Sequence, residues 1–267
     1  MYFITFSRKM GTKGTEIAKF VAKELQYDFY NTGDIEKKAE EMGFLDDIRE
    51  VNDTTPHPLK RFFSYRPVIC LYRLQAVIYE IARLGRAVIL GRGGNMLFRS
   101  LPYVLNVRVI ASQEKRIRNL LERGYKREDA IMVMEKSDRE RESFIKFAFH
   151  HNWDNPELYD VVFNTDNLTV NVAADMILCA AHSKEAYGHS GDVLNFLNMM
   201  KLEVRVRAVL AEAYFPASYV SAFVTEPGKV QLTGVVQVPW EKSVAERTVI
   251  EVEDVESVEN KIEIASM

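Results

Sequence analysis

The chain begins MYFITFSRKMGTKGTEIAKFVAKEL, and these residues 1–25 decide the fold. The apolar run up to Phe6 predicts a buried strand, and the apolar spacing from Glu16 to Leu25 predicts an amphipathic helix. Between them lies a short loop that contains Gly and Lys. A strand that feeds such a loop at a helix N-terminus brings backbone N–H groups and a cation to one point, which is how proteins hold phosphate. The stretch therefore predicts a phosphate-binding loop after a buried strand.

The loop departs from the G-x-x-x-x-G-K-[ST] template of phosphate-binding loops. Lys13-Gly14-Thr15 supplies the KGT, but neither glycine of the template lies at the required offset before Lys13. In an alignment without gaps, Gly14 falls on the lysine position and Glu16 on the hydroxyl position. A one-residue indel puts Lys13 and Thr15 there instead. The sequence alone does not decide between these two alignments.

The composition is that of a globular protein with a sizeable core. Of the 267 residues, 47% are apolar and 27% are charged, and no uninterrupted apolar stretch approaches the length of a membrane span. The first residues lack the basic region and cleavage site of a signal peptide, so we expect a cytoplasmic protein. Cys70 and Cys179 lie in apolar segments, which predicts buried thiols in a reducing compartment and no disulfide.

Charge is uneven along the chain. Residues 1–185 hold 28 Lys and Arg against 26 Asp and Glu, whereas residues 186–267 hold 7 against 12. The first part is thus nearly neutral and the tail is acidic. No basic stripe with interleaved aromatic residues occurs, so we expect no nucleic-acid partner.

Strand and helix patterns alternate through the first two thirds of the chain. Apolar runs typical of strands lie at 2–6, 27–30, 87–90, 104–110 and 159–165, and helical patterns lie between them. Strands interleaved with helices indicate βαβ units. We therefore expect an α/β fold with three αβα layers, a parallel sheet, and a ligand crevice at the carboxyl ends of the strands. This domain is placed at residues 1–185.

The tail has a different pattern. A polar, Gly-containing segment predicts a linker at residues 186–192. Residues 193–267 then have the pattern helix, strand, strand, helix, strand, with Glu226-Pro227-Gly228 as the turn of a hairpin. Because this αββαβ order cannot continue a parallel sheet, we expect a second, small α+β domain.

Five segments together resemble the cytidylate kinase-like branch of the P-loop nucleoside monophosphate kinases. They are Ile4–Arg8 with the Gly11–Thr15 loop, Tyr30–Ile35, Val88–Arg92, Ser112–Ile117 and Lys136–Arg141. Their order and spacing match over the first 185 residues. The resemblance implies a P-loop NTPase fold, ATP and Mg²⁺ as cofactors, and a phosphotransferase that acts on a nucleoside monophosphate or another small acceptor.

The resemblance also implies the residues of the site. The donor phosphates are expected at Gly11, Thr12, Lys13, Gly14 and Thr15. Members of this branch often carry a Ser-Arg start, so Arg8 is an alternative to Lys13 as the cation that offsets charge. The expected catalytic residues are Lys13, Arg8, Arg139 and Arg141, and the expected substrate-binding residues are Thr32, Gly33, Asp34, Arg92 and Asp138.

Several positions depart from the family pattern. Gly91-Arg92 resembles a GRD motif whose arginine holds the acceptor phosphate, but Gly93 replaces the aspartate. Asp138 and Arg141 match the D-x-x-R of the lid segment. Since they lie three residues apart on one helix face, an ordinary surface ion pair is the alternative.

Two further segments resemble parts of the same pattern. The Thr32-Gly33 segment is followed by Glu36-Lys37 where a Tyr-Arg is common, which displaces or removes a cationic phosphate contact. The stretch from Trp153 to Tyr159 resembles the approach to the last strand. The preceding His150-His151 pair cannot face one ion from a regular helix, so we expect no metal site there.

The tail resembles a BON domain. The residues that carry this resemblance are Val204–Leu210, Gly228–Val236, Ala245–Arg247 and Val255–Ile262. BON domains are similar to small modules that contact ligands or phospholipids, but an acidic copy is a poor candidate for anionic lipid. Self-association, or a protein partner that regulates the attached domain, is the expected role.

Two functions from different classes follow. The first is an ATP-dependent nucleoside monophosphate kinase, with a pyrimidine monophosphate as the candidate acceptor and no protein nucleophile. The second is a nucleotide-binding sensor without transfer activity, whose BON domain responds to the occupancy of the kinase-like domain. The displaced Lys13 and the missing aspartate after Arg92 motivate the second.

Overall fold

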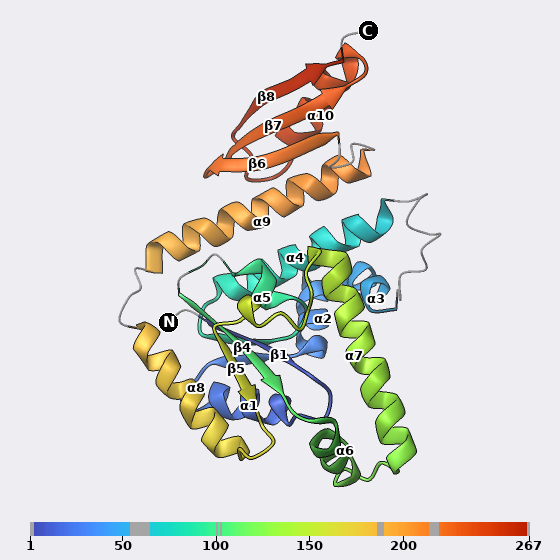
Figure 1. The fold of residues 1–267 in the computed structure, drawn as a ribbon. Helices are drawn as coiled ribbons and strands as arrows, with labels where there is room; N and C mark the ends of the chain where they lie inside the picture. The colour runs from blue at the N-terminus through green and yellow to red at the C-terminus, as the bar shows by residue number, and fades with distance from the viewer. Residues whose placement is uncertain are drawn as a thin grey trace. The chain divides into compact units, whose positions relative to one another are not determined.

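The computed structural model describes residues 3–53, 65–99, 101, 103–185, 190–213 and 219–265. Figure 1 shows the ribbon, in which the chain forms two compact units. Met1–Ile35 and Leu84–Ser190 make up the first unit, and Glu36–Arg83 and Gly191–Met267 make up the second. The domain boundaries expected from the sequence stay a prediction, and most of the expected linker, residues 186–189, lies outside the described residues.

The first unit is built on a five-stranded parallel sheet, as the alternating pattern predicts. The strand order is β2-β3-β1-β4-β5, and all four pairings are parallel. The strands are β1 (Phe3–Arg8), β2 (Asp28–Tyr30), β3 (Ala87–Leu90), β4 (Val104–Ile110) and β5 (Val161–Asn164). The carboxyl ends of the central strands β1 and β3 therefore lie side by side, which is where parallel sheets place their ligands.

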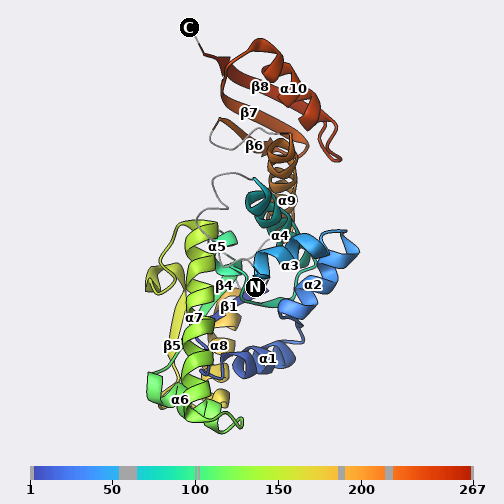
Figure 2. The ribbon, with the colours of Figure 1, turned by 90° about the vertical axis from the view of Figure 1, so that its right-hand side faces the viewer.

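Helices connect these strands. They are α1 (Gly14–Leu25), α2 (Thr32–Glu41), which continues into the second unit, α5 (Gly94–Leu97), α6 (Gln113–Leu121), α7 (Arg127–Phe149), a 3-10 turn at Pro156–Leu158 and α8 (Val170–Glu185). Helices α6 and α7 pack against each other, and Figure 2 shows α7 as a long rod beside the sheet.

The two faces of the central strands carry different side chains. One face is apolar: Ile4 and Phe6 of β1 pack with Ile17 and Val21 of α1 and with α8. Burial at roughly 25 cal/mol per Å² makes this cluster the main stabilising feature of the unit. The opposite face is polar and also buried, because the register pairs Thr5 with Asn106 and Ser7 with Arg108.

The second unit contains the end of α2, two further helices and the tail from Gly191. The elements are α3 (Leu45–Asp53), α4 (Arg66–Arg83), α9 (Ser190–Glu212), β6 (Val220–Glu226), β7 (Lys229–Val236), α10 (Pro239–Ile250) and β8 (Ser257–Ile264). Strands β6 and β7 are antiparallel and β7 and β8 are parallel. The αββαβ order expected for the tail is confirmed. Helices α9 and α10 bury one face of this small sheet.

Ion pairs connect the helices of the second unit. Arg73 of α4 binds Asp47 of α3 and Glu212 of α9, and Lys201 of α9 donates to Glu80 of α4 at 2.7 Å. Arg83 and Lys201 lower the pKa of Glu80 to about 2, against desolvation that acts in the opposite direction.

The cysteine prediction is half right. Cys70 is buried in α4, whereas Cys179 is exposed because it lies on the outer side of α8, away from the face that carries Ala173, Ala174 and Ile177. Among the described residues, no helix is both long and apolar enough to cross a bilayer.

A backbone contact in the hairpin β6–β7 gives a stability prediction. Gly234 has φ +136°, and a Cβ there would lie 1.9 Å from the carbonyl oxygen of Tyr219. We expect Gly234→Ala to destabilise the second unit by about 3 kcal/mol, because both the dihedral and the clash act against it. Gly43→Ala is the matched control: φ is +77° but the space is open, so about 1 kcal/mol is expected. Chemical denaturation measures both, and equal costs would contradict the clash.

Candidate phosphate site

The loop Lys9–Lys13 joins β1 to α1, and its carbonyl groups are held by side chains. The carbonyl oxygen of Lys9 accepts a hydrogen bond from Thr12 Oγ1 at 2.9 Å, and that of Met10 accepts one from Arg116 Nε at 2.6 Å. The carbonyl oxygen of Gly11 accepts from Asn119 Nδ2 at 2.8 Å, and that of Thr12 accepts from Thr165 Oγ1 at 3.1 Å. Lys13 closes the loop with φ 61° as the N-cap of α1. Each carbonyl of the loop is thus turned toward a donor of the protein.

The amide groups of the loop have the opposite arrangement. Within the described residues no acceptor takes the N–H groups of Gly11, Thr12, Lys13 and Thr15. Gly14 N–H makes only a 3.3 Å contact to Thr12 Oγ1. Successive amides at a helix N-terminus form an anion-binding concavity, and the helix dipole favours negative charge there. The loop residues predicted from the sequence to bind phosphate therefore have the donors that a phosphate group needs.

Lys13 lies at this loop, but its side chain points elsewhere. The ammonium group donates to Glu122 Oε2 at 2.9 Å, just beyond α6; the Lys13 side chain is half-buried and that of Glu122 is exposed. An exposed ion pair of this kind contributes at most about 1 kcal/mol. The structure therefore places the predicted lysine at the edge of the loop and its charge beside α6.

Positive charge gathers instead around Arg8, at the end of β1. Burial and the nearby charges of Arg141 and Arg92 lower the pKa of Arg8 to about 9. Arg141 also donates to the Arg8 carbonyl at 3.2 Å, so α7 lies against the end of β1. The Arg8 side chain packs on Gly91, because its Nη1 lies 2.9 Å from where a Cβ of residue 91 would be. We call Arg8, Arg92 and Arg141 the arginine cluster.

The arginine cluster has a clear electrostatic character. Asp138 Oδ1 lies 3.8 Å from Arg141 Nη1. Burial lowers the pKa of Arg141; the charges of Asp138 and Glu140 raise it, and those of Arg108 and Arg116 lower it further. Like charges held together in a half-buried place disfavour one another, and a bound anion relieves that repulsion.

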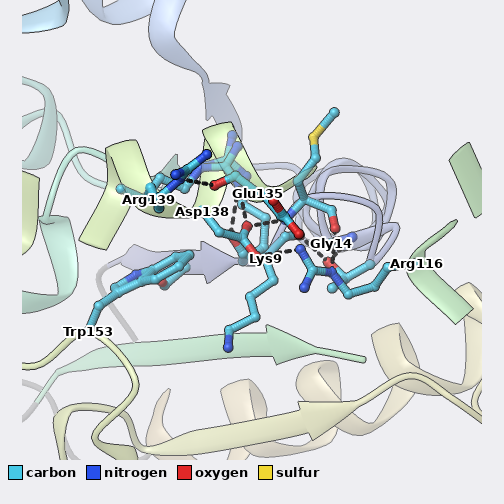
Figure 3. A network of polar contacts seen from close by, with 12 residues as sticks. Lys9, Gly14, Arg116, Glu135, Asp138, Arg139 and Trp153 are labelled. Atoms are coloured by element: carbon cyan, nitrogen blue, oxygen red, sulfur yellow. Dashed lines mark hydrogen bonds and ion pairs between the residues drawn. The ribbon is translucent and has the colours of Figure 1, made fainter. Parts of the chain in front are cut away.

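Asp138 contacts the loop from α7, and Figure 3 shows it within the network of polar contacts around Lys9 and Arg116. Its Oδ1 accepts the N–H of Met10 at 3.0 Å, and its Oδ2 is bound by the buried Arg116. Together with Arg141 it fixes the backbone at residues 8 and 10. Asp138, which was predicted to bind substrate, thus holds the loop in place.

Arg139 lies apart from the arginine cluster. It is exposed on α7 and donates to the carbonyl of Glu135 one turn earlier, at 3.4 Å (Figure 3). Of the two lid arginines predicted to be catalytic, the structure brings only Arg141 to the loop.

The predicted acceptor segment at residues 32–34 forms a helix cap. Gly33 N–H donates to Asn31 Oδ1 at 2.8 Å, and Asn31 N–H donates to Asp34 Oδ2 at 3.1 Å. This reciprocal pair satisfies two N–H groups at the start of α2. Thr32 is the first residue of that helix, so capping accounts for the polar residues here without a ligand.

The buried charge of Arg108 was not predicted from the sequence. Arg108 is 2% exposed and donates to Ser7 Oγ at 2.8 Å and to Asp154 Oδ1 at 2.6 Å. Its guanidinium lies 3.7 Å from the ring centre of Trp153, whose indole N–H also donates to Ser7. Asp154 in turn accepts from Lys9 at 2.9 Å.

This network ties the last strand to the first residues of the loop. The signal in the sequence was a single Arg in the otherwise apolar run 104–110, followed far along the chain by the segment from Trp153 to Tyr159. Tyr159 completes the set, with its hydroxyl donating to the carbonyl of Trp153 at 2.8 Å. Trp153 and Tyr159 are structural here, in agreement with the reading of that segment.

The histidine pair shows no metal geometry. His150 ends α7 with φ 57°, outside the regular helix. In the described part of the chain, no three His, Cys, Asp or Glu side chains are grouped as metal ligands would be.

The strand order and the loop between β1 and α1 define a class, the kinase-like P-loop fold. The family follows from the sequence match. Residues 3–167 match the model of the cytidylate kinase-like family, and the chain belongs to that family. Residues 201–266 match the BON domain, so the chain carries a C-terminal BON domain.

A solved structure supports the fold. An uncharacterized protein from Eubacterium ventriosum is 19% identical with a TM-score of 0.55, over 68% of this chain and 99% of that one. Shikimate kinase from Bacteroides thetaiotaomicron is 13% identical (TM-score 0.41, 68% and 98% covered), and a gluconokinase from Sinorhizobium meliloti is 12% identical (TM-score 0.40, 70% and 98% covered). No protein with a curated description matches the sequence.

The arginine cluster gives a prediction about stability. We expect Arg8→Met to raise the Tm of the ligand-free protein by about 2–4 °C, roughly 1 kcal/mol for a domain of this size, because it removes one of three like charges. The rise in Tm that inorganic phosphate causes in the native protein should be lost in the variant. Lys13→Met is the control. Because Lys13 is paired with Glu122, this variant should not raise the Tm. A lower Tm with phosphate stabilisation intact in Arg8→Met would contradict the cluster's role.

Proposed function

We propose that this protein is an ATP-dependent phosphotransferase of the nucleoside monophosphate kinase type. One observation carries the proposal: four N–H groups of the loop, which have no acceptor among the described residues, lie near the arginine cluster at the carboxyl ends of β1 and β3. A kinase needs a cradle for the donor phosphates and cations for the charge that spreads during transfer. The loop amides would supply the first and the arginine cluster the second, and family membership supports the same chemistry.

The residues take different roles in this proposal. The N–H groups of the loop would hold the β-phosphate of the donor, and Mg²⁺ would bind with the phosphates. Arg8, not Lys13, would offset the charge on the transferred group, since Lys13 is engaged with Glu122. Arg92 would clamp the acceptor phosphate, with Arg141 beside it. The acceptor hydroxyl or phosphate oxygen attacks directly, so no protein nucleophile is required.

The role of Arg139, the acceptor, the location and the role of the BON domain are also proposals. Arg139 would act only if its part of α7 moved toward the loop, because its guanidinium now contacts its own helix. A pyrimidine monophosphate is the proposed acceptor, and the cytoplasm is the proposed location. The BON domain is proposed to mediate self-association or to bind a regulatory protein.

A second function is favoured by one specific observation. The lysine of the loop is displaced from the phosphate position, and Glu16, which binds Arg123, stands near the place of the usual hydroxyl residue. Backbone amides bind phosphate without these groups, but transfer is slowed when the cation is misplaced. A nucleotide-binding sensor that performs no transfer fits these substitutions.

Turnover and binding separate the two functions. With ATP, Mg²⁺ and CMP, dCMP, UMP or AMP, we expect a coupled assay to show ADP formation that depends on the acceptor. Calorimetric titration with ATP is run on the same sample. Tight ATP binding without turnover on any acceptor would leave the sensor, and no binding at all would remove both functions.

Two variants test which cation acts at the loop. Arg8→Ala is expected to lower kcat/KM by about 10²–10³-fold, the scale of one lost charge-stabilising donor. Lys13→Ala is expected to cost no more than about fivefold, because an exposed ion pair stores little free energy. Similar losses in both variants, or a larger loss in Lys13→Ala, would show that Lys13 leaves Glu122 to reach the donor.

A further inference from the structure

A pocket of about 410 Å³ lies in the second unit. Every residue that lines it belongs to this unit, and the lining comes from α4, from α9, from the end of α10 with the turn that follows, and from Phe44. A volume of this size is within the range of pockets that hold small organic molecules. None of the lining residues that the structure describes comes from the phosphate loop.

Small and apolar side chains make up the interior of the pocket. Ala76 of α4 and Ala208 of α9 both line it and are 1% and 6% exposed. Val204, Val252 and Phe44 add apolar surface that is buried or half-buried. Because an alanine side chain stops at Cβ, the two helices leave a space here that longer side chains would fill. The interior therefore suits an apolar group.

The two guanidinium groups at the pocket already have acidic partners. Arg73 is bound by Asp47 and Glu212. Arg205 is bound by the carboxylates of residues 253–254, at 3.0 and 2.8 Å. Each guanidinium thus meets two carboxylates, and an anionic ligand would have to displace one of them. The pocket is for this reason a poor site for an anion.

Glu251 differs from the other carboxylates that line the pocket, because it has no ion-pair partner among the described residues. It is exposed and is the C-cap of α10, where the partial negative charge of a helix C-terminus disfavours a carboxylate. Glu212, the last residue of α9, brings a carboxylate to the pocket from a second helix C-terminus. A cation beside Glu251 would therefore interact favourably with its carboxylate and with the end of α10.

We propose that this pocket binds a small organic cation, an amine with an apolar body. The apolar body fills the space beside Ala76 and Ala208, and the ammonium group lies against Glu251. Such a ligand contacts α4 and α9 at once, so it links the two sequence segments of the second unit and stabilises that unit. The site shares no residue with the phosphate loop, so it does not depend on whether the protein transfers phosphate.

Three probes with the same apolar body separate the role of charge from that of shape: hexylamine, hexanol and hexanoate. Their affinities for the full chain are measured by protein-observed NMR titration. We expect hexylamine to bind about fivefold more tightly than hexanol, the scale of one exposed ion pair, and hexanoate to bind most weakly. Hexylamine should also raise the Tm. Binding of hexanoate as tight as that of hexylamine, or no binding of hexylamine, overturns the proposal.

A pair of glutamine variants tests the role of the carboxylate. Glu251→Gln should lower the affinity for hexylamine to that for hexanol and leave the affinity for hexanol unchanged. Glu263→Gln is the matched control, because it removes the same charge from an exposed glutamate of β8 that does not line the pocket. It should leave all three affinities unchanged. Equal losses in the two variants would show general attraction of amines to an acidic surface and would overturn the site.

Ala208→Leu tests the apolar interior. The longer side chain takes up part of the pocket, so all three probes should bind about tenfold more weakly. The Tm shows whether the variant folds, and unchanged affinities in a folded variant contradict the placement of the apolar body. If Ala208→Leu does not fold, the comparison of Glu251→Gln with Glu263→Gln still decides.

Discussion

The structure of the site depends on how the carbonyl groups of one loop are held. A backbone segment binds an anion only if its N–H groups point inward, and each carbonyl must then find a donor elsewhere. Here Arg116, Asn119 and Thr165 supply those donors. Removal of any one leaves a carbonyl without its partner and lets the adjacent peptide rotate, so the affinity of the loop for phosphate is set by residues that never meet the ligand.

The polar face between β1 and β4 explains why Arg8 is where it is. Ser7 and Arg108 are register partners, and Arg108 is stacked on Trp153 and paired with Asp154. Burying a guanidinium costs several kcal/mol unless its donors are satisfied, which this network does. Because Ser7 is fixed on one face of β1, the next residue, Arg8, must point to the other side of the strand's end. The position of Arg8 thus follows from strand alternation and from the buried charge of Arg108 on the neighbouring strand β4.

Local patterns predicted the elements well, since they depend on periodicity and turn residues. The strand before Ser7, the helix after Lys13 and the hairpin at Gly228 were all predicted from neighbours in sequence. The network around Arg108 was not, because a single charge in an apolar run gives no indication of its partners, and Trp153 lies far along the chain. The exposed Cys179 was predicted wrongly, since α8 carries apolar residues on its outer side too. Composition alone cannot tell such a helix from a fully buried one.

The predicted site residues divide in a similar way. Arg8, Arg92 and Arg141 are brought together by the meeting of β1, β3 and α7, and the family resemblance had placed all three at the site, in different roles. The direction of the Lys13 side chain was not readable from the sequence, because it depends on Glu122, more than a hundred residues away. Asp138 is a similar case: its spacing to Arg141 was visible, but its bond to the amide of Met10 depends on tertiary packing.

The second unit is discontinuous in sequence, and this has a consequence for synthesis on the ribosome. Glu36–Arg83 leaves the ribosome early, yet Lys201 and Glu212, the partners of α4, follow 121 and 139 residues after Glu80 and Arg73. Contacts between such distant segments form late and fold slowly. Until the tail has been made, the polar groups of α4 are paired with water or with other chains. The growing polypeptide therefore passes through a long interval in which α4 lacks its partners on α9, and a chain that ends near residue 190 would never gain them.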